Sequence, residues 1–180
     1  MLGAVVAGVV LGVASKLVDY VAPSWVGNSS AVWGLVAFLV GLRASGVAQG
    51  ARRGTVALAV ATASYYAYRL FVAENISNRF ALKAFLFWMA LALPTGAISG
   101  AAGAASGRTM WALPAGAFAG EAIFVLASGR RTVHAAVAAG IAALLATRAR
   151  WTARGLAIAT AAGVTVFLVA AGYRSLVLRG

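Results

Sequence analysis

The sequence predicts an all-α membrane protein, a bundle of seven transmembrane helices joined by short connections. Of its 180 residues, 63% are hydrophobic and only 10% are charged, and the mean hydropathy is +0.93. An ordinary soluble domain is about 25% charged. A spanning helix needs roughly 20 apolar residues, so the chain has room for seven or eight spans and for no soluble domain. We therefore expect a single bundle over residues 1–180.

Seven apolar segments support this count, and each is too long and too unalternating for a strand of a membrane barrel. The predicted spans are 2–22, 30–44, 52–72, 79–105, 110–128, 132–147 and 152–176. Pro94 predicts a kink in the fourth span. The first span carries Lys16 and Asp19 late in its apolar run, so we interpret it as a retained helix and not as a signal peptide. The second and sixth are short, which leaves six helices as the alternative.

The glycines fall at helical spacings. Gly3, Gly8 and Gly12 form one such run, and residues 96–107 carry four more glycines. Small residues let helices approach closely in lipid, and we interpret these glycines as packing positions. Close contacts of this kind suit a rigid bundle or a homo-oligomer.

The basic residues indicate an orientation. Seven arginines lie on the side of the 45–51 loop, namely Arg43, Arg52, Arg53, Arg108, Arg148, Arg150 and Arg154. On the other side, once Lys16, Arg69 and Lys83 are set aside as lying within apolar segments, five remain: Arg79, Arg130, Arg131, Arg174 and Arg179. The positive-inside rule then places the 45–51 loop and the N-terminus in the cytoplasm.

Composition also argues against several function classes. The net charge of +12 would suggest nucleic acid in a soluble protein, but here the basic residues punctuate apolar segments and would contact membrane lipid. With no cysteine and one histidine, we expect no metal and no cofactor. The sequence has no GxSxG elbow, P-loop or HExxH motif. His134 follows Arg130 and Arg131, and we interpret it as an interfacial residue.

The three acidic residues are predicted to lie in one half of the bundle, opposite the 45–51 loop. On parallel, odd-numbered spans, Asp19 lies near the end of the first, Glu74 just past the end of the third and Glu121 a little beyond the middle of the fifth. Ionisable groups inside a membrane are costly and usually functional. Glu121 has no basic residue within a turn, which favours a functional acid. Asp19 is either its partner or only the ion-pair partner of Lys16, and Glu74 is interpreted as a loop carboxylate.

Most aromatic residues fall in the same half, which indicates either a cavity or a thick interfacial belt on one side. We expect Asp19 and Glu121 to be catalytic. The expected substrate-binding residues are Tyr20, Asn28, Trp33, Tyr65, Tyr66, Tyr68, Arg69, Glu74, Phe85, Trp88 and Phe124. A carboxylic acid held without a cation in an apolar pocket can donate its proton to an alkene or epoxide, and aromatic faces can stabilise the resulting carbocation.

The chain resembles the small bacterial integral-membrane terpene cyclases that act on prenylated indoles and related meroterpenoid precursors. The resemblance lies in the size, the seven spans, Asp19 in "SKLVDY", Glu121 in "AGEAIF" and the aromatic run "SYYAYR" at 64–69. It implies a metal-independent cyclase in which a carboxylic acid protonates a linear, hydrophobic prenylated substrate.

Two other functions fit the same pattern. One is a small-molecule transporter or substrate-capture subunit, either proton-coupled or working with an energising partner, because transport would equally use buried acids. The other is a structural or assembly protein whose acids only pair with arginine.

Overall fold

The computed structural model is helical, and it describes residues 1–22, 27–73, 78–105, 107–128 and 132–176. These residues contain seven α-helices and no strand, as predicted. The helices are α1 (Leu2–Val21), α2 (Ser30–Gly41), α3 (Val47–Tyr68), α4 (Asn78–Ala104), α5 (Ala112–Ala127), α6 (Thr132–Ala146) and α7 (Ala153–Leu176). A π-helical turn, η1 (Arg69–Ala73), continues α3, and a 3₁₀ turn, η2 (Arg108–Trp111), precedes α5. The largest difference from the predicted bounds is the start of α3, which extends five residues ahead of Arg52.

The chain divides into two compact units. The first comprises residues 1–29 and 35–105, and the second comprises residues 30–34 and 106–180. The first turn of α2 therefore belongs to the second unit and the rest of that helix to the first. A single bundle over residues 1–180 stays a prediction.

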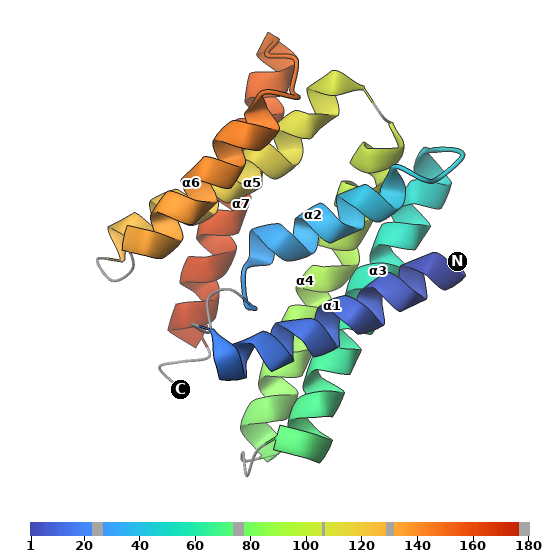
Figure 1. The fold of residues 1–180 in the computed structure, drawn as a ribbon, viewed down its shortest axis with the longest axis vertical. Helices are drawn as coiled ribbons and strands as arrows, with labels where there is room; N and C mark the ends of the chain where they lie inside the picture. The colour runs from blue at the N-terminus through green and yellow to red at the C-terminus, as the bar shows by residue number, and fades with distance from the viewer. Residues whose placement is uncertain (23–26, 74–77, 106, 129–131, 177–180) are drawn as a thin grey trace. The chain divides into compact units, whose positions relative to one another are not determined.

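In the first unit, α3 packs against both α1 and α4 (Figure 1). Glycines form the closest contacts between α3 and α4. A Cβ added at Gly54 would overlap the carbonyl oxygen of Gly96 and lie 2.9 Å from the Cα of Gly100. Nearer the C-terminal end of α3, a Cβ at Gly12 of α1 would overlap the Ala61 carbonyl oxygen. These helices therefore pack backbone against backbone, which agrees with the packing role predicted for the glycines.

In the second unit, α5 packs against α6 and α7. Gly116 and Gly120 of α5 face Ala159 and Gly163 of α7 so closely that a Cβ at either glycine would overlap a carbonyl oxygen of α7. At Gly116 and Gly120, the contact of α5 with α7 is thus made by small residues. The buried residues of α5 also include Glu121.

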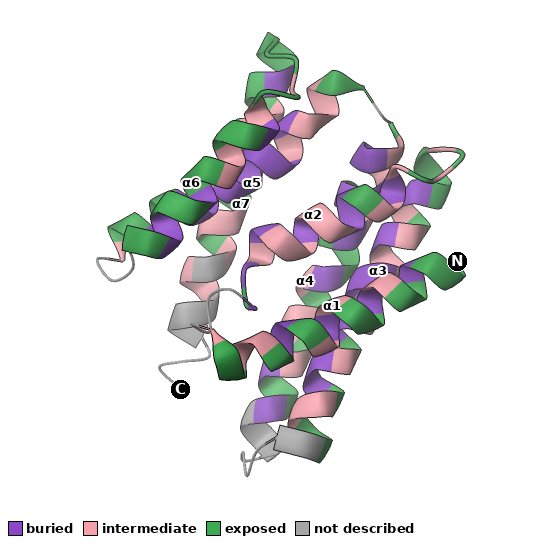
Figure 2. Cartoon of the chain, viewed as in Figure 1, coloured by how far each residue is buried: buried purple, intermediate pink, exposed green. Residues whose placement is uncertain are grey.

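Large aliphatic side chains are exposed along the helices, including Val10, Leu86 and Leu168. Figure 2 shows the exposed parts of the helices in green. Three helical segments are long and apolar enough to cross a membrane: Leu2–Val21, Ala81–Ala104 and Arg108–Ala127. Ser30–Gly41, Thr132–Ala146 and Ala153–Val169 are apolar but shorter. Outward aliphatic side chains are what a lipid environment requires, because lipid does not penalise them as water does.

Candidate functional site

The second unit contains a buried carboxyl–imidazole pair. Glu121 lies on α5 and His134 on the first turn of α6, and the short α5–α6 connection brings them together. The Nε2 atom of His134 lies 2.7 Å from the Oε1 atom of Glu121. Glu121 is 5% exposed and His134 is 8% exposed. We call these two residues the Glu121–His134 pair.

The second carboxyl oxygen of Glu121 binds the start of α2. The backbone N–H of Ala31 donates to Oε2 at 3.0 Å. The first N–H groups of a helix have no partner within the helix, and the positive end of the helix dipole favours a carboxylate there. Glu121 therefore joins α5, α6 and the first turn of α2, all of which belong to the second unit.

This geometry adds a contact that the sequence analysis did not include. Glu121 has no basic residue within a turn of its own helix, but an imidazole from α6 contacts it. His134 was interpreted as an interfacial residue, and the structure shows that its side chain is buried against Glu121. The partners are 13 residues apart and on different helices, so spacing within one helix could not reveal them. The available signal was the placement of the chain's only histidine directly after the connection that follows Glu121.

The first unit holds a separate polar cluster around Asp19. The Nζ atom of Lys16 lies 3.8 Å from Oδ2 of Asp19, an ion pair at the i,i+3 spacing that the sequence offered as one interpretation of Asp19. Asn28 donates from Nδ2 to Oδ1 at 2.9 Å, and the hydroxyl of Tyr65 donates to Oδ2 at 3.4 Å. Asp19 thus connects α1 to α3 and to the segment before α2.

Aromatic rings extend from this cluster. Tyr65 packs edge-on against Tyr66, with ring centroids 5.2 Å apart, and Tyr66 packs edge-on against Phe85 at 5.6 Å. The Lys16 ammonium lies 5.3 Å from the centroid of the exposed Tyr20 ring. The structure therefore gathers Asp19 with Tyr20, Asn28, Tyr65, Tyr66 and Phe85, all of which were predicted site residues.

The other predicted residues are more dispersed. Tyr68 ends α3 and Arg69 begins η1, and both are half-buried. Trp88 packs against Phe87 on α4. Trp33 lies on the first turn of α2, and Phe124 of α5 packs against Phe167 of α7. Glu74 lies outside the described residues. Asp19 and Glu121 belong to different units, so their partnership stays a prediction.

A model of one protein family matches residues 1–178, and its description is a family of unknown function, DUF6518. The chain belongs to this family. No curated protein and no solved structure matches the chain.

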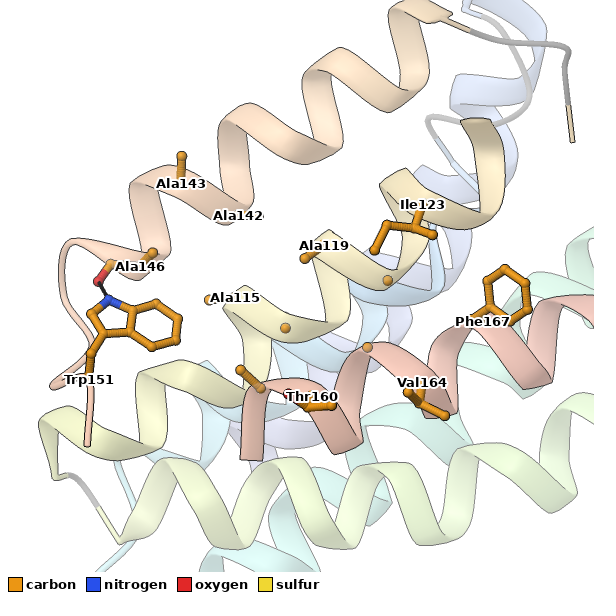
Figure 3. Close-up of a pocket in the computed structure, with 14 residues that line it drawn as sticks. Ala115, Ala119, Ile123, Ala142, Ala143, Ala146, Trp151, Thr160, Val164 and Phe167 are labelled. Atoms are coloured by element: carbon orange, nitrogen blue, oxygen red, sulfur yellow. Dashed lines mark hydrogen bonds between the residues drawn. The ribbon is translucent and has the colours of Figure 1, made fainter. Parts of the chain in front are cut away.

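An apolar cavity of about 520 Å³ lies between α5, α6 and α7 of this DUF6518 chain (Figure 3). Trp151 lines one end and Phe167 the other, and between them the walls are mostly alanine and glycine. We call it the α5–α7 cavity. Gly120 lines it, but Glu121 and the predicted aromatic residues do not.

The two acids of this family member differ in what they can do chemically. Asp19 accepts hydrogen bonds from Asn28 and Tyr65 and forms an ion pair with Lys16, an arrangement that holds three segments together. The Glu121–His134 pair joins a carboxyl to the side chain that ordinarily gains and loses a proton near neutral pH. Among the described residues, no group of three His, Cys, Asp or Glu side chains could hold a metal ion.

Proposed function

We propose that the chain is a polytopic protein of seven spans that couples proton binding at the Glu121–His134 pair to the transport of a small molecule. The 2.7 Å contact between these two buried side chains carries the proposal. Ionisable groups within apolar helices are rare, pair with one another, and mark proton relays in pumps and transporters. If the pair had only a structural role, apolar side chains of similar volume would stabilise the fold as well or better, because burying polar groups costs free energy.

The contact with α2 supplies a route from proton binding to movement. As a carboxylate, Glu121 attracts the N–H of Ala31 and the positive end of α2. A proton taken up by the pair binds the imidazole, which is ordinarily the more basic partner, and the resulting imidazolium beside Oε1 partly neutralises the carboxylate and weakens this attraction. Proton binding would thus release the first turn of α2 from α5, and proton loss would restore the contact.

Proton flux in proteoliposomes tests the proposal. Vesicles containing the purified protein and the internal pH dye pyranine are given a potassium diffusion potential with valinomycin, and then thiamine, riboflavin, biotin or indole. We expect the protein to accelerate internal acidification in the presence of at least one compound, and Glu121→Gln and His134→Gln to abolish the acceleration. Asp19→Asn is the matched control in the first unit. Wild-type flux in the Glu121→Gln variant would contradict the proposal.

A membrane cyclase is the second candidate, and the rings beside Asp19 favour it. Asp19 accepts a hydrogen bond from Tyr65, and the rings of Tyr65, Tyr66 and Phe85 pack against one another in sequence. Aromatic faces of this kind can stabilise a carbocation. The test is incubation of isolated membranes with a linear prenylated indole, without ATP or added metal. Cyclic product that disappears in Asp19→Asn or Glu121→Gln membranes would favour the cyclase over transport, and the absence of cyclic product would exclude it for that substrate.

A further inference from the structure

One end of the second unit carries a cluster of exposed arginines. Two are in the loop between α6 and α7, one is in η2 and one is on the first turn of α7: Arg148, Arg150, Arg108 and Arg154. The backbone N–H of Arg150 donates to the carbonyl oxygen of Arg108 at 3.3 Å, which holds η2 against the α6–α7 loop. We call these four residues the arginine cluster.

Within the second unit, residues 30–34 and 106–180, the sequence has one acidic residue, Glu121. The acids of the chain are Asp19, Glu74 and Glu121, and no acidic residue follows Glu121. Glu121 itself is buried against His134 and α2. The arginine cluster therefore presents a concentrated positive charge that an anion from outside the protein can neutralise.

Tryptophans lie beside the cluster. The Arg148 guanidinium lies 5.7 Å from the centroid of the Trp111 ring. Trp151 follows Arg150 directly and donates from Nε1 to the carbonyl oxygen of Ala146 at 3.1 Å, which fixes its ring at the end of α6. Tryptophan and arginine together are typical of the level of lipid headgroups in a membrane.

The same Trp151 ring forms one end of the α5–α7 cavity. Figure 3 shows Trp151 there, and the walls continue past Thr160 and Val164 to Phe167. The arginine cluster and the apolar cavity thus meet at Trp151. Their juxtaposition matches a molecule with an anionic head and a hydrocarbon chain.

We infer that the second unit binds an anionic phospholipid, with its phosphate at the arginine cluster and part of an acyl chain in the α5–α7 cavity. Arginine forms bidentate hydrogen bonds to phosphate, and basic clusters at a membrane surface favour anionic over neutral lipids. This inference is independent of the proposed transport, because the lipid site does not include Glu121 or His134.

Native mass spectrometry of the full-length protein tests the inference. The protein is released from micelles containing equal amounts of phosphatidylglycerol and phosphatidylcholine with identical acyl chains, and the ratio of the two bound lipids is measured. We expect wild type to retain phosphatidylglycerol preferentially. The double variant R148Q/R150Q should reduce this preference roughly tenfold or more, because each arginine near the surface contributes substantially to anionic-lipid attraction.

A matched control separates a local site from general positive charge. R43Q/R52Q removes two exposed arginines from the first unit and should leave the preference unchanged. Equal losses in the two double variants, or no preference in wild type, would overturn the inference.

A second pair of variants tests the acyl chain. Thr160 and Thr165 are both exposed on α7, but only Thr160 lines the cavity. Thr160→Phe should fill the cavity and reduce retained phosphatidylglycerol at least severalfold, whereas Thr165→Phe should retain the wild-type amount. Circular dichroism checks that both variants keep their helix content. Equal retention in the two folded variants would refute the acyl-chain part of the inference.

Discussion

At the scale of single residues, Glu121 connects three helices. It accepts a hydrogen bond from the start of α2, contacts the imidazole of His134 and lies on the helix at the centre of the second unit. A buried charge that loses its partner is far more costly than a pair that is replaced whole. The single and double variants of this pair should therefore behave very differently.

We predict that His134→Ala destabilises the protein by about 3–5 kcal/mol, because it leaves the Glu121 carboxyl buried beside an empty space. The double variant Glu121→Gln/His134→Ala should be more stable than His134→Ala alone, since no charge then remains at the site. Thermal unfolding in detergent, followed by circular dichroism, measures both. Equal destabilisation in the single and double variants would show that the interaction between Glu121 and His134 does not contribute to the free energy of unfolding.

Asp19 should behave as a structural carboxylate. We predict that Asp19→Asn lowers the free energy of unfolding by about 1–3 kcal/mol, because it weakens hydrogen bonds to a charged group and leaves Lys16 without its anion. The same thermal measurement applies, with Arg52→Gln, at an exposed position of α3, as a control expected to change little.

At the scale of helices, contact between small residues determines how closely elements approach. Gly54 is the clearest case in the first unit, because the backbone of α4 occupies the position that a Cβ atom would need. Gly140 on α6 is the opposite case, since no atom lies within 4 Å of a Cβ built there. The same substitution should therefore have opposite effects at the two positions.

We predict that Gly54→Ala pushes α3 and α4 apart and destabilises the protein by about 1–3 kcal/mol, as overpacking does. Gly140→Ala should be neutral or stabilising by up to about 1 kcal/mol, because alanine is the better helix former. Comparison of the thermal midpoints in one detergent tests both. A midpoint for Gly54→Ala at or above that of wild type would contradict the packing described for this helix pair.

At the scale of the whole molecule, the outward aliphatic side chains and the three long apolar segments determine how the protein behaves in a cell. We predict that it remains in the membrane fraction after alkaline carbonate extraction. The absence of cysteine lets orientation be measured with single engineered cysteines. Ser45→Cys should be protected from a membrane-impermeant maleimide in intact cells and Ser128→Cys should be labelled, because we expect the 45–51 loop to be cytoplasmic. The reverse labelling pattern would invert the predicted orientation.

The sequence predicted the helices well because each helix is a long apolar run, and polar residues or glycine separate one run from the next. It also offered the contact of Lys16 with Asp19 as one interpretation, since residues three apart share one face of a helix. It did not predict the contact of His134 with Glu121 or that of Ala31 with Glu121, because both depend on how separate helices pack. The start of α3 was predicted at Arg52, after a loop at 45–51, whereas Arg52 and Arg53 lie within the first two turns of the helix.

The bond from Ala31 to Glu121 has a consequence for the synthesis of the protein. The helix α2 has 12 residues and is about 18 Å long, shorter than a bilayer core of about 30 Å. Its first turn meets Glu121 only when a residue 90 positions later has been translated. A nascent chain that has emerged only as far as α4 therefore holds α2 without this partner. This bond can form only after α5 leaves the ribosome.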